Sequence, residues 1–290
     1  MFVTSYFLLV KPTFFFYLWK VKSAIRFLVF SNIWVAFCVL ALCSSSEFLL
    51  SSSNYQISQF VFFATLFTYN FQRVVRIGKG LNHVHKVWLA KQNIAIYVLM
   101  ACGGLVSAYR FFEFQLITQV VLIIVGLLSV LYPFGLRKIP FSKIFIISFV
   151  WAVSTMLLLV LENNITISQN IVLHLVSRFL FVFAITIPFD IRDLKYDAQN
   201  LQTIPLFFGV LKARFIALFS LFISLIISVF QYLENTIIFL NLLALILLYF
   251  VTSIFIVKSD EKRSEMYFSF WVESLSILCY LFFVISVLIF

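Results

Sequence analysis

The sequence predicts an all-α membrane protein, a bundle of nine transmembrane helices with its N-terminus in the cytoplasm. Hydrophobic residues make up 63% of the 290 residues and charged residues only 11%, and the mean hydropathy is +1.10. Soluble domains have roughly 45–50% apolar and 25% charged residues. Several apolar runs approach or exceed the roughly 20 residues that a helix needs to cross a bilayer. The runs are continuous, whereas strands of a membrane barrel alternate over about ten residues, so we expect helices.

Nine apolar segments are predicted to span the membrane, at residues 28–46, 56–75, 93–112, 115–134, 142–161, 169–189, 213–233, 235–257 and 268–290. Together they would form one transmembrane domain over residues 28–290. The preceding segment, residues 1–27, is also partly apolar, but Lys11 and Pro12 interrupt it. Because proline breaks the hydrogen-bond ladder of a helix interior, we expect this segment to lie at the cytoplasmic surface of the membrane.

The net charge of +10 is not spread evenly over the loops. Lysine and arginine gather before the first span and after spans two, four, six and eight. The remaining loops carry Glu47, Glu113, Glu162 and Glu234, with Arg110 as the one nearby base. Because basic loops stay in the cytoplasm, the N-terminus is predicted to lie inside and the C-terminus outside the cell (inner) membrane. The basic charge therefore indicates membrane topology and contact with membrane lipids, and no nucleic-acid partner is predicted.

Three of the eleven acidic residues lie within the eight-residue stretch "DIRDLKYD". Asp190, Asp193 and Asp197 have the spacing i, i+3, i+7, which places them on one face of a helix. Carboxylates that close raise one another's pKa unless a cation lies between them. Magnesium suits such a site, since it binds one or two carboxylates and completes its shell with water and phosphate oxygens. The alternative is a solvated loop with ordinary charge pairs, but the position at the cytoplasmic end of a span favours a functional site.

The stretch "DIRDLKYDAQNLQTIPLFFGVLKAR" resembles the second aspartate-rich motif of the UbiA superfamily of intramembrane prenyltransferases. The matching residues are Asp190, Asp193, Asp197, Thr203, Pro205, Gly209, Ala213 and Arg214. The stretch "LYPFGLRKIPFSK" resembles the loop that follows the family's fourth helix, through Tyr132, Arg137, Lys138 and Lys143. The resemblance implies a nine-helix bundle that transfers a prenyl group from a prenyl diphosphate to an aromatic or lipid acceptor. It also implies Mg²⁺ held between two aspartate-rich motifs that face each other across a central cavity.

The chain departs from the family at the first aspartate-rich motif, where it reads "YNFQRVVRIGKG". Asn70 matches the leading asparagine, but Phe71, Val74 and Gly78 stand at the three aspartate positions, and no carboxylate occurs between Glu47 and Glu113. Arginine and lysine are found there instead. Two interpretations remain open. The basic side chains clamp the diphosphate in place of a metal, or the protein keeps the fold without the transfer reaction and serves as a lipid-diphosphate-binding or scaffold subunit of a membrane complex.

These observations define a predicted site. The resemblance assigns catalytic and metal-ligating roles to Asp190, Asp193 and Asp197. The predicted diphosphate-binding residues are Asn70, Arg73, Arg76, Lys79, Arg137, Lys138 and Lys143. The predicted partners of an active enzyme are a prenyl diphosphate and an aromatic or lipid acceptor, whereas an inactive protein would have a membrane-protein partner.

One further charge lies within a predicted span. Arg178 follows His174 by one helical turn, and a mid-membrane arginine must face the bundle interior or a hydrated cavity. Glu273 on the last span is one candidate partner, and the alternative places Arg178 in the wall of a cavity.

Overall fold

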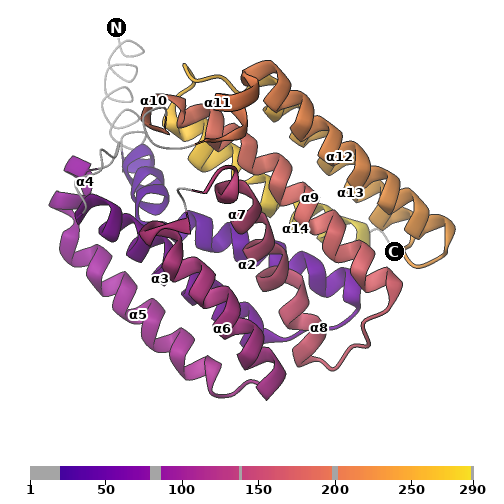
Figure 1. The fold of residues 1–290 in the computed structure, drawn as a ribbon. Helices are drawn as coiled ribbons and strands as arrows, with labels where there is room; N and C mark the ends of the chain where they lie inside the picture. Colours follow the sequence, from indigo (N-terminus) through magenta and orange to yellow (C-terminus); the bar gives the residue numbers. More distant parts are fainter. Residues whose placement is uncertain (1–19, 79–85, 137–138, 198–201, 289–290) are drawn as a thin grey trace, which may run out of the picture.

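The computed structural model describes residues 20–78, 86–136, 139–197 and 202–288, and the described residues include no strand. Nine long helical segments follow the nine predicted spans in order (Figure 1). They are α2 (Ile33–Leu50), α3 (Tyr55–Gly78), α5 (Asn93–Phe111), α6 (Leu116–Leu131), α7 (Ser142–Ala152) continued by η3 (Val153–Leu157) and α8 (Leu158–Glu162), α9 (Gln169–Arg192), α12 (Val210–Leu233), α13 (Phe239–Lys258), and η4 (Tyr267–Val272) with α14 (Leu275–Leu288). The all-α prediction is therefore confirmed.

Within the described residues, eight of these helical segments are long and apolar enough to cross a membrane. The exception is α3, the second predicted span, which has 24 residues but a more polar sequence. Its last turns carry Gln72, Arg73 and Arg76, and these side chains line the cavity described below. The chain is a multi-pass membrane protein, and the polar residues of α3 lie at the end of the helix that borders the cavity.

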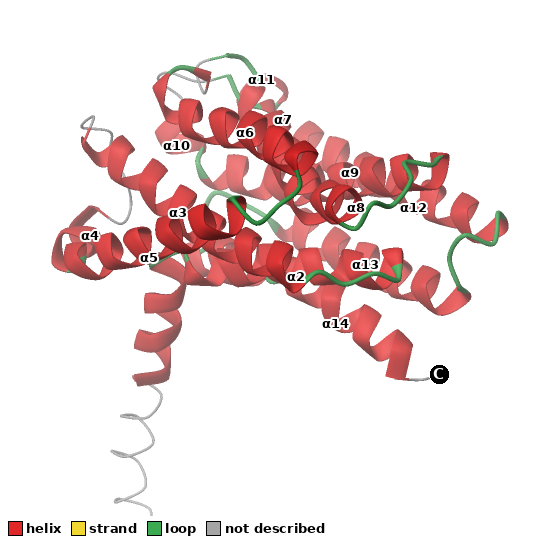
Figure 2. Ribbon diagram, turned by 90° about the horizontal axis from the view of Figure 1, so that it is seen from below, coloured by secondary structure: helices red, strands yellow, loops and turns green. Residues whose placement is uncertain are grey.

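Short elements connect the long helices at the end of the bundle where α9 ends. They are α4 (Lys86–Lys91), η1 (Tyr132–Phe134), α10 (Leu194–Asp197) and α11 (Ile204–Phe208). In Figure 1, α10 and α11 lie at the same end of the bundle, whereas α8 lies at the opposite end. Residues 20–30 are also helical, and Figure 2 shows this segment leading away from the bundle.

Helix packing joins segments that are distant in the sequence. α2 packs on α3 and α14, α3 on α5, and α9 on both α7 and α12, while α13 lies against α12 and α14. The contact of α3 with α5 is close because of Gly103, where a Cβ atom would lie only 2.8 Å from the carbonyl oxygen of Phe63. Small residues allow membrane helices to approach in this way.

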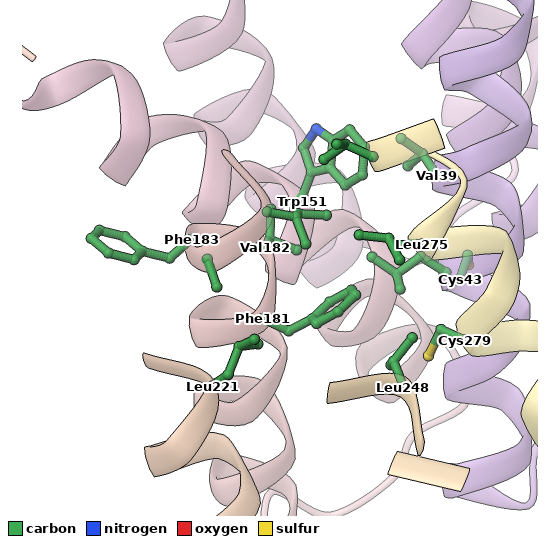
Figure 3. Packing of buried hydrophobic residues seen from close by; sticks show 14 of the residues in the cluster. Val39, Cys43, Trp151, Phe181, Val182, Phe183, Leu221, Leu248, Leu275 and Cys279 are labelled. Atoms are coloured by element: carbon green, nitrogen blue, oxygen red, sulfur yellow. The ribbon is translucent and has the colours of Figure 1, made fainter. Parts of the chain in front are cut away.

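The apolar core lies in the middle of the bundle, around α9 (Figure 3). Phe181, Val182 and Phe183 belong to α9, and Val182 lies beside Trp151 of α7. The remaining labelled side chains come from four further helices: Val39 and Cys43 of α2, Leu221 of α12, Leu248 of α13, and Leu275 and Cys279 of α14. Asp190 and Arg192 lie near the C-terminal end of α9, and the cavity described next lies at this end.

Candidate functional site

A cavity of about 180 Å³ opens where α3 and α9 end and where α2, α7 and η4 begin. Consecutive spans run in opposite directions, so these alternate helix ends meet at one face of the bundle. Its charged lining residues are Arg73, Arg76, Lys143, Arg192, Asp193 and Glu273. Four of the six are cationic, so the cavity attracts anions.

The polarity of the cavity wall changes with depth. On α7, Lys143 lies in the first turn, and Ile147 and Trp151 follow at intervals of four residues, each about one turn deeper. On α9, Arg192 is the last residue, and Ile185 and Val182 lie two to three turns before it. The cavity therefore offers charged groups near the bundle face and apolar or aromatic groups toward the core.

Lys143 bridges two of the predicted catalytic aspartates. Its Nζ lies 2.8 Å from Oδ1 of Asp190 and 3.0 Å from Oδ2 of Asp193. Asp193 lines the cavity, whereas Asp190 is 1% exposed and lies outside the cavity lining. The i, i+3 spacing thus brings both carboxylates to one lysine, as expected for one helix face. The side chain of Asp197 lies outside the described residues.

Arg192 connects Asp193 to the beginning of the last span. Its Nε donates to Oδ1 of Asp193 at 2.8 Å, and its Nη1 donates to Glu265 at 2.9 Å and to Ser269 at 3.2 Å. Burial on its own raises the pKa of Asp193, but the positive charges of Arg192 and Lys143 outweigh burial and hold that pKa well below its usual range. Asp193 is therefore a carboxylate at neutral pH.

Arg73 is positioned by the break between residues 20–30 and α2. Asn32 has a left-handed backbone, with φ at 61°, and its Oδ1 accepts a hydrogen bond from Nη2 of Arg73 at 2.6 Å. A second guanidinium nitrogen of Arg73 donates to the carbonyl oxygen of Phe30. The guanidinium is thus fixed at the cavity wall by backbone and amide oxygens.

Asn70 is buried behind the residues that line the cavity, and it supports the position of Asn32 and Arg73. It is 0% exposed, and its Oδ1 accepts from Nδ2 of Asn32 at 2.8 Å. Its own Nδ2 donates to the carbonyl oxygens of Ser31 and Leu66, both at 2.9 Å. Asn70 does not line the cavity, and its amide is committed to holding Asn32, which in turn holds Arg73.

Glu273 lines the cavity from the turn that follows the π-helical segment η4. Among the described residues, no hydrogen bond or ion pair engages its carboxylate. The expected pairing of Glu273 with Arg178 is wrong, because Arg178 donates to the hydroxyls of Ser45 and Ser46 at 3.0 and 2.9 Å. Arg178 belongs instead to a separate, buried polar group deeper in the bundle, and Glu273 is left to the cavity.

Of the ten predicted site residues, Arg73, Arg76, Lys143 and Asp193 line this one cavity. Asp190 and Asn70 lie outside its lining, and Lys79, Arg137 and Lys138 fall outside the described residues. Sequence reasoning did not assign Arg192, Ser269 or Glu273 to the site, nor the aromatic pair Tyr69 and Trp151, in which the indole Nε1 donates to the phenol oxygen at 2.9 Å. An acidic residue inside the last apolar span was the available signal for Glu273.

Comparison with known proteins identifies the class to which this bundle belongs. The UbiA prenyltransferase family model matches residues 88–275, more than half of the chain, so the protein belongs to the UbiA prenyltransferase family. No curated protein sequence matches the chain.

Solved structures share the fold at low sequence identity. A UbiA homologue from Archaeoglobus fulgidus bound to GPP and Mg²⁺ superposes with a TM-score of 0.64 and 11% identity, over 90% of this chain and 99% of that one. The apo structure of a UbiA homologue from Aeropyrum pernix K1 gives 0.64 and 9%, over 88% and 98%. A digeranylgeranylglyceryl phosphate synthase structure gives 0.57 and 12%, over 93% and 100%. The Archaeoglobus protein was also solved with DMAPP and Mg²⁺ and with Cd²⁺.

The described residues of this chain do not offer a comparable set of metal ligands. They contain no group of three or more His, Cys, Asp or Glu side chains placed to hold a metal ion. The Lys143 ammonium lies between Asp190 and Asp193, in the place that a cation shared by the two carboxylates would take. Across the cavity, α3 presents Arg73 and Arg76 in place of acids. In this arrangement the donor set does not fit Mg²⁺.

Proposed function

We propose that this chain binds a prenyl diphosphate in the cavity and transfers the prenyl group to an aromatic or lipid acceptor at the cytoplasmic face of the inner membrane. The observation that carries the proposal is the placement of four cationic side chains on one cavity that continues into apolar and aromatic lining. The cationic side chains suit the diphosphate headgroup, and the apolar and aromatic lining suits the isoprenoid chain.

The cavity charge suits a polyanion. Among the described residues, the four cations Arg73, Arg76, Lys143 and Arg192 outnumber the two acidic lining residues, Asp193 and Glu273, so the net charge of this lining is positive. Arginine forms paired hydrogen bonds to phosphate oxygens, and such charge-assisted bonds are about twice as strong as neutral ones. The volume of about 180 Å³ is below the roughly 300–1,000 Å³ of typical ligand pockets, so it suits the headgroup and the first part of the chain.

The reaction needs little covalent participation by the protein. The allylic carbon–oxygen bond breaks, and the diphosphate leaves with the electron pair. The acceptor then forms a bond to the allylic carbon and releases a proton. Arg73 and Arg76 would stabilise the charge that develops on the leaving diphosphate, and Glu273, the cavity carboxylate without a hydrogen-bond partner among the described residues, would accept the proton.

In this proposal a metal ion could bind only after the side chains around the aspartates rearrange. For Asp190, Asp193 and Asp197 to hold Mg²⁺ as the family resemblance implies, Lys143 would first have to leave Asp190 and Asp193. The steps above therefore use the side chains of the chain itself.

The test is transfer by the purified protein in liposomes, with a panel of labelled prenyl diphosphates and aromatic and lipid acceptors. We expect the double variant Arg73→Gln and Arg76→Gln to lower kcat/KM by about 10²–10⁴-fold, because each of the two charge-assisted contacts contributes about 1.5–3 kcal/mol. The matched control is Lys258→Gln with Lys262→Gln, two exposed cations outside the cavity lining. Equal loss in the control, or no turnover by the wild type with any pair, would contradict the proposal.

The ion pairs also support a second candidate function. Lys143 and Arg192 already neutralise Asp190 and Asp193, which suits a protein that retains a lipid diphosphate without converting it, as a subunit of a membrane complex. Saturable binding of a prenyl diphosphate without turnover, together with a defined membrane-protein partner in a detergent pull-down, would select this alternative.

A further inference from the structure

The position of Lys143 is fixed by the backbone around it. It lies in the first turn of α7, which begins directly after Phe141, and the backbone of Phe141 is left-handed with φ at 59°. The amide of Phe141 donates to the carbonyl oxygen of Gln202 at 2.9 Å, so the start of α7 is joined to the segment that leads from the aspartate motif into α11. The position of Lys143 beside the aspartates therefore depends on the backbone hydrogen bond between Phe141 and Gln202, as well as on the length of the lysine side chain.

Two cations oppose the two carboxylates around Lys143. Asp190 and Asp193 bring two negative charges, and Lys143 and Arg192 bring two positive charges, all within 3.0 Å of a partner, while Arg192 also pairs with Glu265 at 2.9 Å. Each of the four side chains is less than one quarter exposed. Two close carboxylates in such a setting need about two positive charges to remain ionised, which is the charge that a divalent cation would supply. The chain supplies it from its own side chains.

We propose that Lys143 takes the place of a divalent cation, so that the cavity binds organic diphosphates without any metal. The inference rests on the proposed function for the identity of the ligand, a diphosphate ester of a prenyl alcohol. The ammonium of Lys143 holds the two carboxylates together, and Arg73 and Arg76 reach the diphosphate directly from the opposite helix. Within the described part of the chain, Lys143 already occupies the place between Asp190 and Asp193 that a divalent cation would take.

The first experiment measures geranyl diphosphate binding to the detergent-purified protein by calorimetry, in EDTA and in excess Mg²⁺. We expect the Kd to change by less than about threefold, since no metal bridges ligand and protein. Inorganic diphosphate is the second ligand, and weaker binding of it would show that the apolar lining contributes. Loss of geranyl diphosphate binding in EDTA, restored by Mg²⁺, would overturn the inference.

The second experiment uses Mn²⁺ alone and does not depend on any activity. Replacing Lys143 with methionine keeps the length of the side chain and removes its charge, leaving the Asp190–Asp193 pair short of one cation. Electron paramagnetic resonance should then detect Mn²⁺ binding at least about tenfold tighter in Lys143→Met than in the wild type, and Mn²⁺ should raise the Tm of the variant. Equal Mn²⁺ affinity in the two proteins would overturn the inference.

Two further variants test whether misfolding of Lys143→Met could explain its response to Mn²⁺. The triple variant Lys143→Met, Asp190→Asn, Asp193→Asn removes the excess negative charge, so its Tm should not respond to Mn²⁺. Lys143→Arg keeps the cation and should behave like the wild type toward Mn²⁺. If the wild type binds no diphosphate in either buffer, the proposed function fails, but the Mn²⁺ comparison still decides whether Lys143 replaces a divalent cation.

Discussion

The side-chain amide of Asn32 donates to Oδ1 of Asn70 at 2.8 Å, and this contact joins the start of α2 to the last turns of α3. The same Asn32 accepts from Arg73, so the two asparagines and the arginine act as one unit. Asn70, the asparagine that begins the motif, is therefore a positioning residue: it holds Asn32 and does not line the cavity. The cavity depends on this unit for one of its four cations.

Replacing Asn70 with alanine should therefore weaken both stability and ligand binding. The variant removes the hydrogen bonds that Asn70 makes to the amide nitrogen of Asn32 and to the carbonyl oxygen of Ser31, both buried, which costs about 1–3 kcal/mol. Thermal unfolding in detergent would measure the loss, and geranyl diphosphate titration would report the looser Arg73. Asn93→Ala, at an exposed helix start, is the control and should change neither quantity. A variant with wild-type Tm would contradict this role.

Glu273 should matter for turnover but not for ligand affinity. Glu273→Gln keeps the size of the side chain and removes its ability to accept a proton, so kcat should fall by about 10²–10⁴-fold. The Kd for geranyl diphosphate should stay about the same, because glutamine keeps the shape of the cavity and the four cations that bind the diphosphate remain. Single-turnover kinetics beside equilibrium binding would separate the two effects, with exposed Glu261→Gln as the control. Unchanged kcat would exclude Glu273 as the proton acceptor.

The lowered pKa of Asp193 makes the free energy of unfolding depend on pH. Because that pKa is lowered in the folded state, the ion pairs of Asp193 stabilise the protein above the unfolded-state value of about 3.9. This contribution is lost as the pH falls below about 4 toward the lower folded-state pKa. Unfolding followed between neutral and acidic pH should show a smaller acid destabilisation in Asp193→Asn than in the wild type. Parallel curves for the two proteins would contradict the assignment.

The contact of α3 with α5 should tolerate no added atoms at Gly103. A Cβ there would lie 2.8 Å from the carbonyl oxygen of Phe63 and 3.0 Å from the amide nitrogen of Phe67, so Gly103→Ala must push the helices apart. We expect a loss of about 1–3 kcal/mol, as for other overpacked sites. Gly126→Ala is the matched control, since nothing lies within 4 Å of its Cβ position. Equal Tm values for the two variants would show that α3 and α5 adjust freely.

Much of the fold could be predicted from local sequence. Continuous apolar runs of membrane length gave helices in the right order, and the spacing of Asp190 and Asp193 placed both carboxylates within reach of one cation. Local sequence did not predict the full length of α3. Arg73 and Arg76 are charged residues of a kind found in loops, although both lie within the helix. Arg73 donates to Asn32 and Phe30, and Arg76 lines the cavity; a hydropathy pattern contains neither relationship.

The sequence by itself determined the helical class, the order of the spans and the family motif around Asp190, since each depends on residues that are neighbours along the chain. Only the tertiary structure decided that Lys143 meets Asp193, 50 residues away, that Arg192 meets Glu265, 73 residues away, and that Glu273 faces the cavity instead of Arg178. The physical reason is that a bilayer enforces backbone hydrogen bonding within each apolar run, whichever helices surround it. The partner of a charge, by contrast, is set by which helix ends pack together.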